Sequence, residues 1–292
     1  MVGNRRGSSL EGDLAMIALI WASLFVVVVG LTLILRMINE ALRKRITPLE
    51  LVLDRLPSSF DGSKILLITD IHRRRLPKRL IMSQVDQVDW VFLAGDIMEK
   101  NVPIKRVKSN MSLLRLVAPV FAVHGNHDYK ANTANLDRVL EQCDVRLLMN
   151  SNVKLYKNGA HVWLTGMDYP PHRKRSYPSL PKLPAHEMGT CRMVLVHDPA
   201  WINRYSVKPA DLILAGHTHG GQIILPLVGP VHLDKEYRNI ACGLFQWKQP
   251  NALIKRATMF VSRGFGYRHL PLRFRCPSEM HLIILRSSNA GC

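Results

Sequence analysis

Short apolar runs, rich in β-branched or large aliphatic residues, recur along the body of the chain and end at polar residues. Runs of this kind predict strands that are buried on both faces of a sheet. In open α/β sheets ligands bind outside the carboxyl ends of the strands, so the polar residues that follow such runs are expected to line a site. The five runs of this type span residues 65–69, 91–94, 120–123, 193–196 and 212–215.

The rest of the pattern predicts further strands and a few helices. Apolar positions at helical spacing predict a helix over residues 136–143, and a weaker pattern predicts one over residues 76–89. Asn158-Gly159 between two apolar runs predicts a hairpin. These elements indicate an α/β domain of mixed sheets with helical cover. The further strands are expected at residues 50–54, 153–155, 162–165, 259–262 and 281–285.

A long apolar segment lies near the N-terminus. Residues 14–35 contain no charged side chain, and a helix of this length spans roughly the 30 Å hydrocarbon core of a bilayer. The segment is apolar on every face, which disfavours a buried core helix. A cleaved signal peptide is the competing interpretation, but its apolar region is normally shorter, and no small-x-small cleavage site follows before Arg36. We therefore expect an uncleaved single-pass membrane anchor over residues 14–36.

The anchor divides the chain into a tail over residues 1–13, a basic juncture over residues 37–48, and a body over residues 49–292 with no second domain boundary. The juncture is compatible with a helix that stops near Pro48. The positive-inside rule places the more basic flank, and the body with it, in the cytoplasm. A twin-arginine pair in the tail keeps export as the alternative. The basic residues that decide this are Arg5 and Arg6 before the anchor, and Arg36, Arg43, Lys44 and Arg45 after it.

The composition and net charge of the chain indicate what kinds of molecule it can bind. The chain has 292 residues, of which 47% are hydrophobic, so it can build a full core. Its 40 basic residues against 22 acidic ones give a formal charge of +18. Such a balance indicates anionic neighbours: phosphate esters, nucleic acid or an anionic lipid surface. The five cysteines are scattered without a CxxC pair, which argues against a cysteine zinc site and a disulfide framework.

The polar residues at the ends of the five runs have the chemistry of a two-metal site. Carboxylates can bridge two cations, imidazoles bind without adding charge, and an amide oxygen completes the shell. This donor set suits Mn, Fe or Zn better than Ca, and two such ions roughly 3.5–4 Å apart stabilise displacement at phosphorus. The motifs are Asp70-Ile71-His72, Gly95-Asp96, Gly125-Asn126-His127-Asp128, His197-Asp198 and Gly216-His217-Thr218-His219.

Taken singly, most of these motifs are weak. An Asp-x-His pair or a Gly-Asp after a strand is often an ordinary turn, and His197 alone would be interpreted as a core histidine. The segment GHTHGGQ is the most specific, because two histidines two positions apart among glycines have little structural purpose. The occurrence of all five motifs in this order at strand ends predicts a two-metal hydrolytic site.

The ordered set resembles the calcineurin-like metallophosphoesterases over residues 50–285. Three later segments are similar to the bacterial membrane-associated branch, which includes phosphodiesterases and enzymes that cleave UDP-2,3-diacylglucosamine in lipid A synthesis. The resemblance implies a four-layer αββα sandwich of two mixed β-sheets, preceded by the transmembrane helix, with residues 49–292 as the metallophosphoesterase domain. The segments are GHTHGGQIILPLVGP (216–230), FVSRGFG (260–266) and LPLRFRCPSEM (270–280).

The resemblance also implies roles for individual residues. His127 would contact the scissile phosphate and protonate the leaving oxygen, with Asp128 as its orienting partner. The favoured ions are a pair of Mn²⁺, with Fe or Zn as alternatives, and Asp96 bridges them. One metal would be held by Asp70, His72, Asp96 and His219, and the other by Asp96, Asn126, His197 and His217.

Three arginines are candidates for substrate binding. Arg73 and Arg75 follow the first motif directly, which favours phosphate contact over an ordinary solvated charge run. Arg263 is a weaker candidate between the last two predicted strands.

The favoured function is hydrolysis of a phosphodiester or pyrophosphate bond at the membrane, in a lipid-linked substrate such as UDP-2,3-diacylglucosamine. A general phosphodiesterase or phosphomonoesterase acting on soluble nucleotides or phosphate esters is the first alternative. A membrane-tethered binder of anionic polymers, with structural metals, is the second. We expect no dedicated nucleic-acid partner, and the sequence leaves the oligomeric state open.

Overall fold

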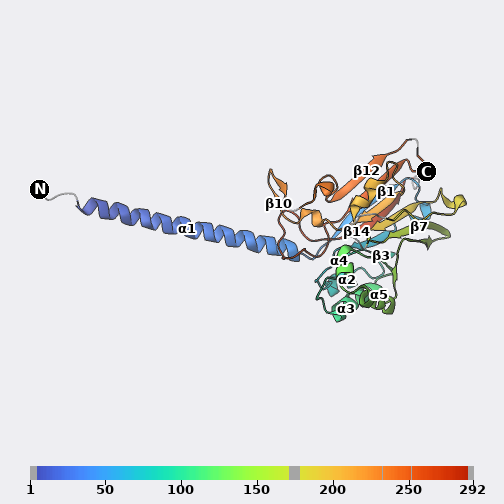
Figure 1. Ribbon diagram of the computed structural model, residues 1–292, viewed down its shortest axis with the longest axis horizontal. Coiled ribbons are helices and arrows are strands. Elements are labelled where there is room, and N and C mark those ends of the chain that lie inside the picture. Colours follow the sequence, from blue (N-terminus) through green and yellow to red (C-terminus); the bar gives the residue numbers. More distant parts are fainter. Residues whose placement is uncertain (1–4, 171–177, 232, 251, 289–292) are drawn as a thin grey trace.

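The computed structural model describes residues 5–170, 178–231, 233–250 and 252–288. Its first element is α1, Arg5–Leu42, which projects far from the rest of the molecule (Figure 1). Its apolar stretch, within Asp13–Leu42, has a mean hydropathy of 2.7, and none of that stretch is buried inside the protein. The helix is therefore long and apolar enough for a membrane anchor or a signal sequence.

The body contains two six-stranded mixed sheets. In the first, β14 runs antiparallel to β2 and every other pair is parallel. Its order is β1 (Ile46–Leu53), β14 (Met280–Ser287), β2 (Lys64–Ile68), β3 (Trp90–Ala94), β4 (Val120–Val123) and β5 (Val145–Leu147).

In the second sheet both outermost pairs are antiparallel and the inner pairs are parallel. Its order is β12 (Gly243–Lys248), β13 (Arg256–Val261), β9 (Leu212–Ala215), β8 (Arg192–Val196), β7 (Ala160–Met167) and β6 (Ser151–Lys157). A small separate hairpin consists of β10 (Ile224–Leu225) and β11 (Gly229–Pro230).

The two sheets pack face to face, and the alternation of side chains along β2 shows how. Ile65 and Leu67 join a cluster shared with β8 and β9 of the other sheet. Leu66 and Ile68 point the opposite way, into a cluster with the helices. Both faces of the strand are thus buried, which explains its unbroken apolar run. The helices on this outer face are α2 (Lys78–Met82), α3 (Ile104–Arg115), α4 (Asn126–Lys130) and α5 (Thr133–Gln142).

The outer face of the second sheet is covered by short 3-10 turns. Trp201 and Ile202 of the turn η3 (Pro199–Arg204) pack onto Val194 and Ile213. The predicted fold class, two mixed sheets with an apolar N-terminal helix, is confirmed. The other 3-10 turns are η1 (Ser58–Phe60), η2 (Ala185–Glu187), η4 (His219–Gly221) and η5 (Lys235–Tyr237).

Some predicted elements differ from the structure. The helix expected over residues 76–89 is reduced to the five residues of α2, and Asp86 has a positive φ of 60° that a helix does not allow. The helix through the juncture ends at Leu42, and β1 begins at Ile46, so Pro48 lies in a strand. Because β1 is an edge strand, the missing N–H of proline is tolerated there. Helix α3 was not predicted at all, whereas α5 confirms the helix expected at residues 136–143.

The last turn of α1 is part of the domain. The Arg74 guanidinium lies over the ring of Phe265, 3.7 Å from its centroid, and donates a hydrogen bond to the Phe265 carbonyl. It also donates to the carbonyl oxygens of Ala41, Leu42 and Arg43, at 3.3, 2.8 and 3.2 Å. The last carbonyls of a helix have no partner within the helix, so Arg74 supplies donors to groups that the helix itself leaves unpaired.

We therefore predict that Arg74→Met destabilises the full chain by at least about 2 kcal/mol, because it leaves the buried carbonyls of Ala41 and Phe265 without this donor and removes the contact with the Phe265 ring. Urea unfolding in detergent, followed by circular dichroism, measures the change. Arg75→Met is the matched control: its side chain is exposed, and it should shift the free energy of unfolding by less than about 0.5 kcal/mol. Equal midpoints for the two variants would contradict the role of Arg74.

Candidate metal centre

The backbone at the strand ends is bent sharply where the expected ligands lie. All five affected residues have φ in the left-handed region, which Asp, Asn and His tolerate better than most side chains but still at a cost of order 1 kcal/mol. The bend lets side chains two positions apart face one point, as the spacing of Asp70 and His72 requires. The residues and their φ values are Asp70 (54°), His72 (50°), Asp96 (51°), His217 (74°) and His219 (50°).

One group of ligating atoms gathers around His72 and His219. Their Nε2 atoms lie 3.0 Å apart. Asp70 Oδ1 is 3.5 Å from His219 Nε2, and Asp96 Oδ2 is 3.6 Å from His72 Nε2. Asp70 Oδ1 is buried and has no hydrogen-bond partner. Since buried polar atoms are nearly always paired, this unpartnered oxygen beside two imidazole nitrogens fits a cation.

A second group lies on the other side of Asp96. His197 Nε2 and His217 Nδ1 are 3.1 Å apart, and Asn126 Oδ1 is 3.1 and 2.9 Å from them. Asp96 Oδ2 is 3.4 Å from His197 Nε2, so this one oxygen is close to both groups. His197 Nδ1 donates to the Ala94 carbonyl at 2.8 Å. That bond directs the Nε2 atom of His197 into the group, as the outer hydrogen bond of a ligating histidine does.

Two glycines leave room for these contacts, Gly95 beside a residue of the opposite sheet and Gly125 beside the neighbouring strand end. Gly95 has a φ of 81°, and a Cβ on it would lie 2.5 Å from His197 Nδ1. A Cβ on Gly125 would lie 2.2 Å from Asp96 Oδ1. No side chain fits at either position without moving a residue of the centre, which explains why glycine precedes Asp96 and Asn126 in their motifs.

Burial sets the protonation states of the residues around His72 and His219. It raises the pKa of Asp70 to about 6 and lowers the pKa of His72 to about 4. Burial, with His72 nearby, also holds the pKa of His219 well below its usual value. Both imidazoles are therefore neutral near pH 7, which is the form that binds a metal.

His197 behaves differently. Burial alone would lower its pKa, but the carboxylates of Asp96 and Asp70 raise that pKa to about 10. The same contact holds the pKa of Asp96 well below its usual value, against the effect of burial. A cation that binds at His197 Nε2 therefore replaces a proton, and its binding weakens as the pH falls.

His127 stands at the edge of the centre. Its backbone N–H donates to Asp96 Oδ1 at 2.7 Å, and its ring lies edge-on to the ring of His72, with centroids 4.8 Å apart. The side chain is only partly buried, so one side of the imidazole reaches solvent. Burial lowers its pKa. This position suits a group that exchanges a proton with a bound substrate.

The Asp128 side chain accepts hydrogen bonds from backbone N–H groups and, in the described part of the chain, does not contact the His127 ring through a hydrogen bond. Its carboxylate oxygens accept from the backbone N–H groups of Gly125 at 2.8 Å and Met98 at 2.9 Å, and more weakly from Ile97. Among the described residues, no hydrogen bond joins it to the imidazole of His127. This differs from the expectation that Asp128 orients His127: the carboxylate holds together the loops that follow β3 and β4.

The three candidate arginines lie in different surroundings. Arg73 forms two hydrogen bonds with Glu99, at 3.0 and 2.8 Å, and Glu99 Oε2 lies 3.8 Å from His72 Nδ1. Arg263 pairs with Glu279 at 3.1 Å. Arg75 is exposed and makes no hydrogen bond or ion pair within the described part of the chain. The structure thus connects Arg73 to the centre through Glu99 and leaves Arg75 in solvent.

Sequence reasoning missed Arg273, which is fully buried behind the centre. Its Nη2 lies 3.1 Å from His219 Nδ1 and donates to the carbonyls of Arg263 and Gly266, both at 2.7 Å. The two bonds to carbonyl oxygens compensate for the burial of its charge. The guanidinium also packs against the Nδ1 edge of the His219 ring. Arg273 lies within the segment 270–280, but it follows no predicted strand, so no local pattern distinguished it from the arginines around it.

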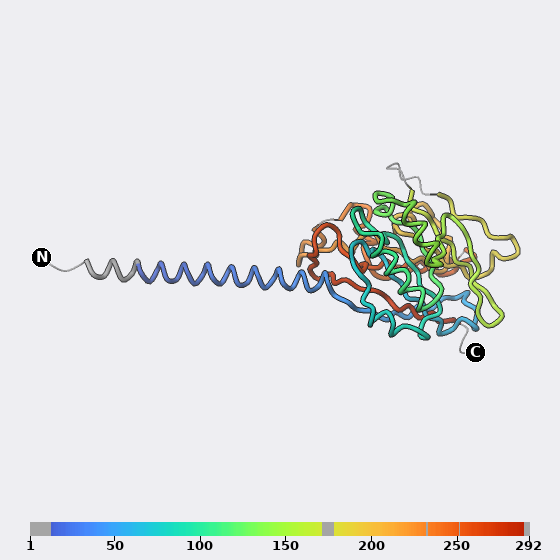
Figure 2. The backbone as a smooth tube through the Cα atoms, turned by 90° about the horizontal axis from the view of Figure 1, so that it is seen from below, coloured from blue at the N-terminus to red at the C-terminus, as the bar shows by residue number. Residues whose placement is uncertain are grey.

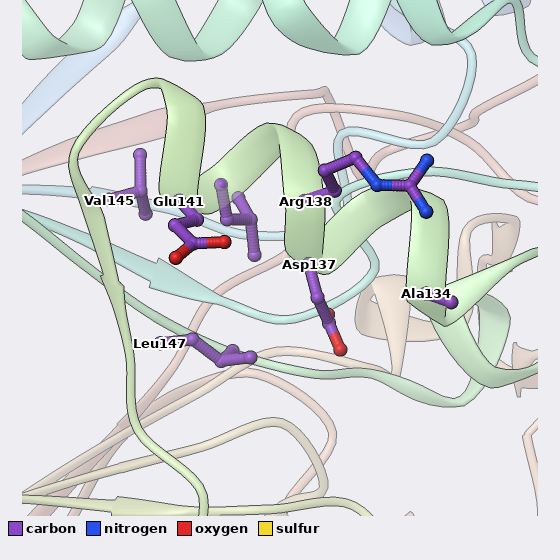
Figure 3. A pocket seen from close by; sticks show the side chains of 7 residues that line it. Ala134, Asp137, Arg138, Glu141, Val145 and Leu147 are labelled. Carbon is purple, nitrogen blue, oxygen red and sulfur yellow. The ribbon is translucent and has the colours of Figure 1, made fainter.

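A surface hollow of about 520 Å³ lies between α5 and β5, away from the expected ligands (Figure 3). One of its lining side chains, Asp137, pairs with His124 at 2.8 Å, but none of the lining residues belongs to the two groups above. The hollow is lined by Ala134, Asp137, Arg138, Leu140, Glu141, Val145 and Leu147.

Three relatives show where this chain is similar to known proteins. It is 30% identical over 260 residues to an uncharacterized metallophosphoesterase of Helicobacter pylori (strain J99), covering 85% of this chain and 65% of that protein. It is 29% identical over 259 residues to phosphodiesterase YaeI of Escherichia coli, covering 81% and 88%. It is 26% identical over 274 residues to a transmembrane protein with metallophosphoesterase domain of Danio rerio, covering 86% and 60%. The chain thus spans less than two thirds of the first and third proteins.

The family model for calcineurin-like phosphoesterases matches residues 63–221. That range is more than half of the chain and contains all seven expected ligands as well as His127. The match confirms the family that the motifs predicted. This chain belongs to the calcineurin-like phosphoesterases and is a metal-dependent phosphoric ester hydrolase.

Proposed function

We propose that the chain is a membrane-anchored phosphoesterase with two metal ions, which cleaves a phosphodiester or pyrophosphate bond in a lipid-linked substrate. The observation that carries the proposal is the position of Asp96. Its Oδ2 atom lies 3.6 Å from His72 Nε2 and 3.4 Å from His197 Nε2, and each of these nitrogens is paired with a second imidazole. One carboxylate between two imidazole pairs is the arrangement that two neighbouring cations need.

The ligand assignment follows from the two groups. When bound, the two cations, Mn²⁺ in the favoured case, would polarise phosphoryl oxygens and supply a water nucleophile at neutral pH. One cation would be held by Asp70, His72, Asp96 and His219, and the other by Asp96, Asn126, His197 and His217.

The protein's own residues bind the ester and move the proton. His127, partly exposed beside His72, donates a hydrogen bond to the scissile phosphate and passes a proton to the leaving oxygen. Its lowered pKa makes the protonated ring a stronger acid. Arg73, which pairs with Glu99 beside the centre, exchanges that carboxylate for a phosphate of the substrate. Arg263 and Arg75 are the further candidates for contact with the substrate.

Three observations support a lipid-linked substrate. Helix α1 leads directly into the domain, the formal charge is +18, and the similar Escherichia coli protein is called a phosphodiesterase. The branch resemblance adds UDP-2,3-diacylglucosamine as a candidate. By the positive-inside rule the catalytic domain lies on the cytoplasmic side of a bacterial inner membrane.

The proposal is tested with the purified full chain and Mn²⁺ in detergent micelles. We expect faster hydrolysis of bis-p-nitrophenyl phosphate than of p-nitrophenyl phosphate, and release of UMP from UDP-2,3-diacylglucosamine. No UMP release would remove that substrate. Preferred turnover of the monoester would favour the alternative of a phosphomonoesterase acting on soluble esters.

Replacing the shared carboxylate should remove both ions. We predict that Asp96→Ala abolishes hydrolysis and metal loading together. The loss of metal affinity should exceed the roughly 10–100-fold that is typical when a residue hydrogen-bonded to a metal ligand is replaced. Metal content by mass spectrometry and turnover of bis-p-nitrophenyl phosphate measure the two effects. Asp234→Ala, at an exposed carboxylate that makes no capping bond, is the control. A variant at Asp96 that kept two ions would contradict the bridging role.

Removing the proton donor should slow the reaction without unloading the centre. We predict that His127→Ala retains its metal content and loses roughly 10²–10⁴-fold in kcat, as is typical for a lost general acid or base. His186→Ala serves as the control, because His186 is exposed and is not one of the expected ligands. If His127→Ala also emptied the centre, His127 would be a ligand instead.

A further inference from the structure

The small hairpin of β10 and β11 carries an exposed apolar tip. Residues 225–228, Leu-Pro-Leu-Val, are all exposed, with Val228 at 75% and Leu227 fully exposed. A run of four exposed apolar residues is unfavourable in water and is typical of a surface that contacts another apolar medium.

The residue at the centre of the turn at this tip is unusual for its backbone conformation. The Val228 N–H donates to the Pro226 carbonyl at 2.8 Å, which closes a three-residue turn around Leu227. Leu227 has a φ of 65°. Left-handed backbone costs a residue with a Cβ roughly 1–2 kcal/mol, so glycine or asparagine would be more stable here in water. A leucine at the outermost point of the turn therefore indicates a contact outside the chain that favours its side chain.

The hairpin lies where α1 leaves the domain, as both views show (Figures 1 and 2). Its first strand is tied to the helix through Phe274: the Ile224 N–H donates to the Phe274 carbonyl at 3.0 Å, and the Arg36 guanidinium lies over the Phe274 ring, 5.5 Å from its centroid. Arg36 is the first charged residue after the apolar stretch of α1. The base of the hairpin is therefore level with the point where the helix changes from apolar to charged.

The surface around the hairpin has the charge of a lipid-binding face. The side chain of Gln222 links the hairpin to the loop at residues 268–270. It accepts a hydrogen bond from the Arg268 N–H at 2.8 Å and donates one to the Leu270 carbonyl. The apolar side chain of Leu270 is 61% exposed. Arg268 and Arg275 are exposed on this loop and just beyond it. Apolar tips flanked by basic side chains bind at the boundary between anionic headgroups and acyl chains.

A basic hollow also lies beside the end of α1. It has a volume of about 600 Å³ and can receive anionic headgroups. Its lining consists of Lys44, Pro77, Lys78, Arg79, Leu80 and Ser83.

We propose that the tip of the hairpin, residues 225–228, inserts with Leu270 into the same bilayer that α1 enters. The occupant of this surface is phospholipid, because the surface continues from the anchor and its charge is complementary to anionic headgroups. The inference rests on the anchor of the proposed function. Gln222 follows His219 by three residues, so this second attachment also sets the orientation of the metal centre toward the membrane.

The full chain reconstituted in vesicles of phosphatidylcholine and phosphatidylglycerol tests this, with brominated acyl chains as the quencher of tryptophan fluorescence. Quenching of the unmodified chain beyond that of its Trp21→Phe variant, which keeps the other four tryptophans, reports insertion of α1. In a Trp21→Phe background, Leu227→Trp reports the hairpin tip. Tyr156→Trp in the same background is the control, because Tyr156 is 68% exposed on β6, which pairs with β7 at the end of the domain away from α1 (Figure 1).

We expect brominated lipid to quench Trp21 and Leu227→Trp, with a blue shift of the latter on reconstitution, and to leave Tyr156→Trp at the background level. Quenching of Trp21 without quenching of Leu227→Trp would overturn the inference while leaving the anchor. A blue shift of Leu227→Trp that bromine does not quench would mean that a protein surface, such as a second copy of the chain, covers the tip. Unquenched Trp21 would overturn the anchor and the inference together, and hydrolysis of soluble esters would still report on the metal centre.

Discussion

The carboxylates of Asp70 and Asp96 lie at the ends of two neighbouring strands, both fully out of contact with water. A buried carboxylate costs several kcal/mol unless it is paired and hydrogen-bonded. Here the compensation comes from the Thr69 hydroxyl, from the backbone N–H groups of His127 and His217, and from imidazoles contributed by the opposite sheet. The face-to-face packing of the sheets, the glycines between them and the left-handed backbone at the strand ends all serve this one requirement.

The strand ends were predictable from the sequence because each combines two independent signals. In residues 91–94 an unbroken apolar run predicts a buried strand, and Asp96, the next polar residue, is the candidate ligand. The positive φ of Asp70, His72 and Asp96 was not predictable, because it goes with contacts between separate segments of the chain. The N–H groups of Asp70 and His72 donate to the carbonyls of Gly95 and Asp96, and the Gly266 N–H donates to the Asp70 carbonyl. The same holds for sheet order, in which β14 inserts between β1 and β2.

Three consecutive arginines show where local reasoning fails. Arg73 pairs with a carboxylate beside the centre, Arg74 is buried against the carbonyls of α1, and Arg75 is exposed. Their side chains are identical, so only the partners distinguish them, and the partners of Arg74 come from residues 41–43 and 265. Asp128 illustrates the same point: its place next to His127 suggested contact with the ring, but the geometry of the loop turns its carboxylate to three backbone N–H groups.

Only residues 43–45 separate α1 from β1, and Arg74, two positions after His72, is bonded to the last carbonyls of the helix. There is consequently no flexible tether between the helix and the reacting atoms. If the helix is held in a bilayer, the candidate metal centre therefore stays at a fixed distance from the bilayer surface as the protein diffuses. Encounters with a lipid-borne ester become a search in two dimensions, whereas long polymers in solution reach the atoms only by lying against the bilayer.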